Sequence, residues 1–215
     1  MRRRFVLIIV LVAATIGPVR AGVDLTPSVE EYTSEGLLYR RVTLKTDTGN
    51  ISFVPPRTWN VRGAKDRLQM EPSDKPFSEA TVVATPTAGP VPLDEPTVQA
   101  LEQQVLSGAP PASQSVQIVS REENPVLGQN PSVQITISYE ALGHTFQRSV
   151  IFLNTRDTQL VFRLTAPKPD FGPLDQAFRR SINSWQWNET KPAPAAPGVA
   201  STMPARTQNG TTAVQ

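Results

Sequence analysis

The sequence predicts one α+β domain over residues 37–188, a twisted antiparallel β-sheet with helices packed on it. Two observations predict this fold class. Apolar and polar residues alternate along many short segments, which is the period of a strand half buried in a sheet. Two other segments repeat apolar residues every three or four positions, the period of a helix with one buried face. Such elements bury their apolar sides against one another in layers.

Strands open the predicted domain. Alternation over residues 38–44, a turn at 47–50 and further alternation at 51–53 predict a β-hairpin. Two shorter strands are predicted at 68–70 and 81–85, and each is followed by a proline, which cannot donate to a sheet.

The first helix is predicted after a proline-punctuated loop. Val98, Leu101 and Val105 recur at helical spacing. The acidic pair at 94–95 is placed to cap the start of this helix, and Gly108 is placed to end it. We expect one short amphipathic helix between these positions.

Four further strands follow this helix, at residues 116–118, 133–139, 146–152 and 160–164. The last three are joined by short connections at 141–144 and 154–157. A parallel return needs a crossover of about a dozen residues or more, so these strands are expected to be antiparallel neighbours.

The last predicted element is an amphipathic helix that begins near Asp170, with Pro173 in its first turn, where a missing N–H costs little. Its apolar face is formed by Phe171, Leu174, Phe178, Ile182 and Trp185. Full burial of each such side chain is worth about 1.5–3 kcal/mol, so this helix needs a sheet to cover.

Residues 1–21 have the features of a secretory signal peptide. Three arginines at 2–4 precede an apolar run at 5–16, and small residues precede a cleavage site after Ala21. The run is about a dozen residues long, whereas a membrane-spanning helix needs roughly 20, which favours cleavage over an uncleaved anchor. The protein is therefore expected to be periplasmic or secreted, with no transmembrane segment after signal cleavage.

Two other segments flank the predicted domain. Residues 22–36 are expected to form a flexible N-terminal segment. Residues 189–215 are rich in Pro, Ala and Thr and contain no aromatic residue, Ile or Leu. Such a segment cannot offset an ordering entropy of about 1–2 kcal/mol per residue, so it is expected to be a disordered tail.

Charge and composition exclude several classes of protein. The chain has 21 basic and 19 acidic residues, but the four arginines Arg2, Arg3, Arg4 and Arg20 leave with the signal peptide. The mature chain then has 17 basic residues against 19 acidic ones, which argues against a nucleic-acid partner. The absence of cysteine excludes disulfides and thiolate metal sites, and a single histidine excludes multi-histidine metal centres. No cofactor, metal site or phosphate-binding loop is predicted.

Catalytic residues are not predicted either. His144 is the only candidate for a histidine general base, and it is expected at the tip of a hairpin. Glu122, Glu123 and Asp157 could form a carboxylate pair only if the fold brought them together. Exposed carboxylates in loops and at strand ends are the simpler interpretation.

Two tryptophans are the candidate binding residues. Trp187 falls outside the apolar stripe of the last helix and stands beside Gln186 and Asn188. An exposed indole next to amides could stack on a sugar or anchor a partner protein. Trp59, which follows two prolines, is the other candidate. For both, packing against the edge of the core is the alternative.

Two stretches of sequence resemble the PsbP/Mog1-like superfamily, which includes the bacterial DcrB-type envelope proteins. One is the strand and Pro-Trp-like opening at 51–59, and the other is the strand at 160–167 that leads into a helix ending on Ser184 and Trp185. The resemblance covers about residues 38–187. It implies an α/β/α sandwich and a binding or accessory role. DcrB-type proteins are commonly lipoproteins, and the absence of cysteine rules out that anchor here.

These features together predict an exported, non-catalytic protein that binds a protein or a cell-envelope component. An alternative is a small-ligand or glycan-binding module that uses the sheet face or Trp187. A third and less favoured possibility is a hydrolase that uses paired carboxylates.

Overall fold

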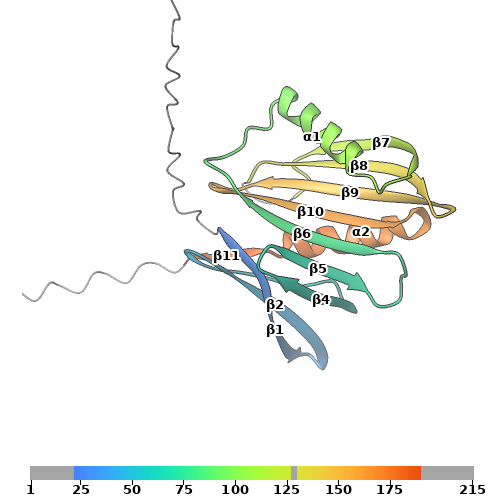
Figure 1. Cartoon of the computed structure of the whole chain (residues 1–215). Coiled ribbons are helices and arrows are strands. Elements are labelled where there is room, and N and C mark those ends of the chain that lie inside the picture. Colours follow the sequence, from blue (N-terminus) through green and yellow to red (C-terminus); the bar gives the residue numbers. More distant parts are fainter. Residues whose placement is uncertain (1–21, 127–129, 190–215) are drawn as a thin grey trace, which may run out of the picture.

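The computed structural model describes residues 22–126 and 130–189 (Figure 1). The predicted signal peptide at 1–21 lies outside these residues, as does the predicted tail at 189–215 except for its first residue. The described part contains two helices, α1 (Glu95–Ser107) and α2 (Lys168–Asn183), and two β-sheets. All strand pairs in these sheets are antiparallel, as predicted.

The described strands divide into a large and a small sheet. The large sheet has the strand order β4 (Trp59–Ala64), β5 (Arg67–Pro72), β6 (Glu79–Pro86), β10 (Thr158–Pro167), β9 (His144–Asn154), β8 (Ser132–Ala141) and β7 (Gln114–Glu123). The small sheet has the order β1 (Val23–Ser34), β2 (Leu37–Thr46), β3 (Gly49–Phe53) and β11 (Gln186–Glu189). The small sheet therefore joins the first and the last described strands in one layer.

The two faces of the large sheet are covered differently. One face, called the α2 face, packs against α2 and the small sheet, in a core that includes Phe53, Phe162 and Phe178. The opposite face, called the α1 face, packs against α1 in a second core that includes Val98 and Ile135. Figure 1 shows α1 on the near side of the sheet and α2 behind it. The alternation of side chains along each strand assigns every residue to one of these two faces.

The α+β class is confirmed, but the predicted α/β/α sandwich over a single sheet is only partly right. On the α2 face, α2 shares the cover with the small sheet, and on the α1 face, α1 packs over β7 and β8. The reason is width. Neighbouring strands lie about 4.8 Å apart, so seven strands are far wider than one helix of about 10 Å diameter.

The expectation of a flexible segment at 22–36 is wrong, because Val23–Ser34 forms β1 and pairs with β2. Val23 and Leu25 are buried in the core of the α2 face. Pro27 lies where a bulge interrupts the pairing, in an edge strand, so its missing N–H breaks no ladder. The rest of β1 is exposed and is ordered by its pairing with β2.

Two further strands were not predicted from the sequence. β4 is the short edge strand of the large sheet, and β11 is the four-residue edge strand of the small sheet. Edge strands bury few side chains, so their sequences show little alternation. The predicted first helix is confirmed: the Asp94 side chain accepts a hydrogen bond from the Thr97 amide at 3.1 Å, and Gly108 follows the last turn.

The end of α2 is fastened to the end of β3. The Ser181 hydroxyl donates to the Val54 carbonyl at 2.8 Å, and the Val54 amide donates to the Ser184 hydroxyl at 2.9 Å. The Trp185 ring stacks on Phe53 with centroids 4.9 Å apart. These contacts direct the chain from α2 into β11.

Among the described residues, neither helix has the length and apolar character that crossing a membrane requires.

Gly63 in β4 allows β1 to approach the large sheet closely. A Cβ atom at Gly63 would lie 2.5 Å from the carbonyl oxygen of Leu25 and 3.0 Å from that of Arg67. We expect Gly63→Ala to lower the free energy of unfolding by about 1–3 kcal/mol, the usual cost of overpacking. Urea denaturation followed by tryptophan fluorescence measures this change. Gly89→Ala is the control, since no atom lies within 4 Å of a Cβ there; equal stability of the two variants would contradict the close approach.

Candidate ligand-binding site

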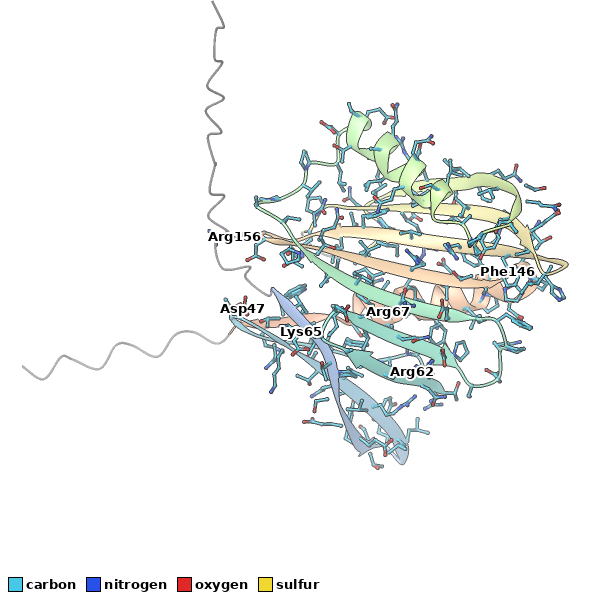
Figure 2. All side chains as sticks on the ribbon, viewed as in Figure 1. Asp47, Arg62, Lys65, Arg67, Phe146 and Arg156 are labelled. Carbon is cyan, nitrogen blue, oxygen red and sulfur yellow. The ribbon has the colours of Figure 1, made fainter. Side chains whose placement is uncertain are left out.

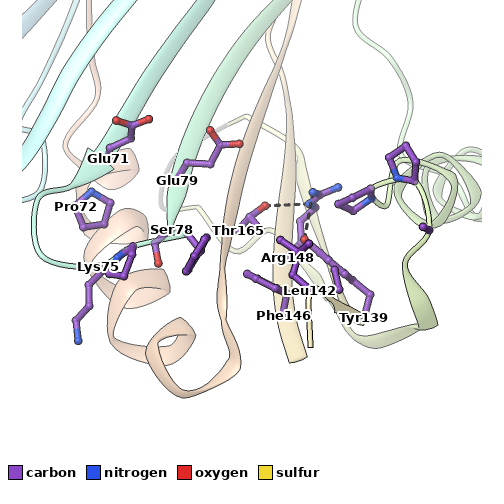
Figure 3. A pocket seen from close by; sticks show the side chains of 16 residues that line it. Glu71, Pro72, Lys75, Ser78, Glu79, Tyr139, Leu142, Phe146, Arg148 and Thr165 are labelled. Carbon is purple, nitrogen blue, oxygen red and sulfur yellow. Dashed lines mark hydrogen bonds between the residues drawn. The ribbon is translucent and has the colours of Figure 1, made fainter. Parts of the chain in front are cut away.

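Three connections meet at one end of the large sheet and enclose a cavity of about 650 Å³. They are the β5–β6 loop at 73–78, the segment after α1 at 110–112 and the β8–β9 turn at 141–144 (Figure 3). We call this cavity the end pocket. Its lining includes Phe77, Pro110, Tyr139, Leu142, Phe146 and Arg148.

The walls of the end pocket are mostly apolar and aromatic. Tyr139 and Phe146 are buried and stack on each other with ring centroids 5.6 Å apart. Phe77 and Leu142 are exposed at the mouth, with Leu142 83 % exposed. The ring of His144, the first residue of β9, stacks on that of Phe77 with centroids 6.4 Å apart. Apolar groups of this size usually lie inside a protein, so their exposure at a concave surface is typical of a binding site.

Each of the three connections holds one non-glycine residue at positive φ. These are Phe77 at 62°, Ala112 at 64° and Leu142 at 52°. A left-handed backbone costs such residues about 1–3 kcal/mol, and this kind of strain gathers at functional sites. In the β8–β9 turn, Leu142 and Gly143 both have positive φ, as a two-residue type I′ hairpin requires. This turn projects the Leu142 side chain into solvent at the pocket mouth.

Arg148 is the charged residue at the base of the end pocket, and it is only 8 % exposed. Its Nε donates to the Thr165 hydroxyl at 3.0 Å, one Nη donates to the Gly108 carbonyl, and the other donates to the Tyr139 hydroxyl at 3.4 Å. The guanidinium also lies over the Tyr139 ring, 5.3 Å from its centroid. Gly108 ends α1, where the helix dipole favours a positive charge. Arg148 therefore fastens the end of α1 to the sheet.

Arg148 forms no ion pair with a carboxylate of the described residues. The other charged residues of the lining have partners: Glu71 pairs with Arg62, Lys75 pairs with Asp170, and Glu79 accepts a hydrogen bond from an amide. A guanidinium has five N–H donors, and three of those of Arg148 are used. A buried cation without a counter-charge and with two unused donors favours an anion beside it.

Burial raises the pKa of the Tyr139 phenol, and the nearby charge of Arg148 opposes this rise only in part. The phenol is therefore neutral at physiological pH. It offers the pocket an aromatic wall and a hydroxyl group without adding charge.

The predicted binding residues lie elsewhere. Trp59 is 3 % exposed and stacks on Phe178 in the core of the α2 face, so its indole is not available to a ligand. Trp59 therefore packs in the core, which was the alternative interpretation of this residue. Trp187 is 41 % exposed on β11 and borders a small recess that Asp47 also lines. In Figure 2, Asp47 and Arg156 lie at the end of the molecule opposite Phe146, so Trp187 is remote from the end pocket.

The candidate carboxylates have separate partners. Glu122 pairs with Arg179 at 2.8 Å, and Glu123 lies 3.6 Å from Arg121, while Asp157 is in the β9–β10 turn. Across the described residues, no three potential metal-ligating side chains come together.

Arg148 was not predicted as a site residue, although its place in the strand indicates which way its side chain points. Phe146, Val150 and Phe152 were predicted to alternate along one strand, and Arg148 has the same parity. A charged residue within an apolar face points into a core or a pocket. The residues that enclose it come from three distant connections, so the end pocket itself has no local sequence pattern.

No model of a known protein family matches this sequence, and no curated protein is similar to it at a significant level. Several solved structures are similar in fold. Cyanobacterial PsbP from Synechocystis sp. PCC 6803 is 12 % identical, with a TM-score of 0.46 over 81 % of this chain and 98 % of that protein. LpqN of Mycobacterium tuberculosis, described as involved in cell envelope biogenesis, is 14 % identical, with a TM-score of 0.43 over 73 % and 90 %.

A third similar structure is PA94 of Pseudomonas aeruginosa, a putative regulator of unknown function. It is 15 % identical, with a TM-score of 0.40 over 75 % of this chain and 99 % of that protein. The resemblance to PsbP-like proteins that the sequence indicated is thus also found between structures. At these identities and TM-scores we draw nothing about function from it.

The raised pKa of Tyr139 predicts a loss of stability in alkaline solution. The unfolded phenol titrates near pH 10, whereas the folded one keeps its proton to a higher pH. Its contribution to stability is therefore complete below about pH 10 and is lost as the pH rises through the folded pKa. We expect Tyr139→Phe to gain stability relative to wild type in urea denaturation as the pH rises above about 10. A stability difference that does not change with pH would contradict this.

Proposed function

We propose that this chain is an exported, non-catalytic binding protein whose binding site is the end pocket. The proposed ligand has an apolar body, held by the aromatic walls, and an anionic group that accepts hydrogen bonds from Arg148. The observation that supports this most directly is the buried guanidinium with no carboxylate partner among the described residues.

The size of the cavity agrees with this role. Binding sites for small molecules usually have volumes of about 300–1,000 Å³ and apolar walls with a few polar groups. The end pocket, at about 650 Å³, has Tyr139 and Phe146 as walls and Arg148 among its few polar groups. Arginine suits binding better than acid–base catalysis because its guanidinium stays protonated throughout the physiological range.

The proposed location is the periplasm or the outside of the cell, because the first 21 residues have the pattern of a cleaved signal peptide. The partner is then a component of the cell envelope or a protein that presents an apolar, anionic group. Both partner classes have the same chemistry at the pocket.

Binding is tested with anilinonaphthalene sulfonate, a fluorescent probe with apolar rings and one anionic group, on the chain without its signal peptide. Leu142→Asp places a negative charge at the pocket mouth, at a residue exposed enough for the fold to be unaffected. We expect its affinity for the probe to fall at least about tenfold, which equals 1.4 kcal/mol. Leu38→Asp is the matched control, because Leu38 is exposed on β2 outside the end pocket, and it should bind like wild type.

The role of the charge is tested separately with Arg148→Gln, whose folding is checked by circular dichroism. This variant should lose affinity for the sulfonate probe while it retains binding of Nile red, an uncharged apolar dye. Unchanged sulfonate binding in both Leu142→Asp and Arg148→Gln would overturn the proposed site.

A second candidate site is the exposed face of Trp187. Asn50 and Asn188 border the same small recess as Trp187, and the Asn188 side chain donates to the Asn50 side-chain oxygen at 3.0 Å. This arrangement favours stacking on a sugar ring. We expect Trp187→Ala to abolish binding on a glycan array without lowering the melting temperature, and Trp187→Phe to retain part of it. Glycan binding that is unchanged in Trp187→Ala would exclude this site.

A further inference from the structure

No described helix covers part of the α1 face of the large sheet. α1 packs over β7 and β8, whereas β4, β5, β6 and β10 continue past it, and several of their side chains on this face are exposed or half-buried. Arg62 and Arg67 lie on these strands, and Figure 2 shows them over the lower half of the sheet, away from α1. This open surface leads directly into the end pocket, because Glu71, Glu79 and Thr165 line the pocket from the same strands.

Three arginines lie near one another on this face. Arg163 on β10 is two residues from Thr165, which pairs with Arg148 on β9. The Cα atoms of Arg163 and Arg148 are therefore about 8 Å apart, measured diagonally across the two strands. On β5, Arg67 pairs with Val83 of β6, and Val83 pairs with Val161 of β10. Arg67 is therefore two strands away from β10, level with a position two residues before Arg163. The alternation of side chains puts all three on the α1 face. We call Arg67, Arg148 and Arg163 the arginine row.

Among the described residues, no carboxylate forms an ion pair with any member of the arginine row. Arg67 and Arg163 form no hydrogen bond or ion pair with the described residues, and Arg148 has only neutral partners. Burial, followed by the positive charges of Arg148 and Arg67, lowers the pKa of Arg163, and Glu79 only partly opposes this. Three like charges that lie near one another and are opposed only in part by Glu79 favour a ligand that carries several negative charges.

We infer that the ligand is an amphiphile with a head of two or more negative charges, which Arg148 and Arg163 bind while the apolar part fills the end pocket. This inference rests on the proposed function, because it needs the end pocket to be the site of the apolar part. It adds the chemical class of the head group. A diphosphate suits the row, because arginine binds phosphate oxygens through paired N–H donors.

The test uses a matched series of probes: farnesyl diphosphate, farnesyl monophosphate, farnesol and inorganic pyrophosphate. Calorimetry should show the tightest binding for farnesyl diphosphate, weaker binding for the monophosphate, and at least tenfold weaker binding for pyrophosphate, which has no apolar part. Pyrophosphate binding as tightly as farnesyl diphosphate would overturn the inference, because the head group alone would then be the ligand.

Arg163→Gln is the decisive variant, since Arg163 forms no ion pair with the described residues that the substitution would break. It should weaken farnesyl diphosphate at least tenfold and change binding of the singly charged sulfonate probe less than twofold. Arg62→Gln is the control, because Arg62 lies on the same face but outside the row and already pairs with Glu71. Arg163→Gln should also unfold at no lower urea concentration than wild type, because it removes a like charge.

The two proposals fail in different ways. If the sulfonate probe binds in the end pocket but Arg163→Gln leaves the affinity for farnesyl diphosphate unchanged, the inference about the head group is wrong and the proposed function stands. If Leu142→Asp changes the binding of neither probe, both are wrong.

Discussion

Strand β9 buries both of its faces, and this requirement organises the rest of the structure. Ile151 and Leu153 enter the core of the α2 face, while Phe146, Val150 and Phe152 enter the core of the α1 face. A strand of this kind needs a covering layer on each side. α2 and the small sheet supply one layer, and α1 supplies the other. The cover is complete only where these elements reach.

The candidate site lies where the cover from α1 ends. α1 ends at Ser107, and Arg148 donates a hydrogen bond to the carbonyl of the next residue, Gly108. This hydrogen bond fixes the end of the helix and the buried guanidinium relative to each other. Next to Arg148, the same face of the sheet carries the aromatic rings of Tyr139 and Phe146, and Arg163 follows on the neighbouring strand β10. The end pocket and the neighbouring arginines are accessible because α1 is too narrow to cover the whole width of the large sheet.

Much of the fold could be predicted because it depends on local patterns. The caps of α1 at Asp94 and Gly108 and the strands from β8 to β10 all have short-range signals. β1, β4 and β11 were not predicted; each is ordered mainly by pairing with a neighbouring strand, and β7, the remaining edge strand, was predicted because Val116 and Ile118 alternate in it. The sequence left burial and exposure open for both Trp59 and Trp187, yet one is buried and the other exposed. Trp59 stacks on Phe178 of α2, a contact between residues far apart in the chain.

The sequence by itself determined the α+β class, the antiparallel order of the C-terminal strands, both helices, and the absence of thiol and multi-histidine chemistry. These follow from periodicity, from short connections and from residue counts, all of which are local or compositional. Only the tertiary structure decided that the described strands form two sheets, that Arg148 is buried with no ion pair to a described carboxylate, and that three distant connections enclose one cavity. Burial and charge pairing depend on residues far apart in the chain, and no local pattern records which of them will meet.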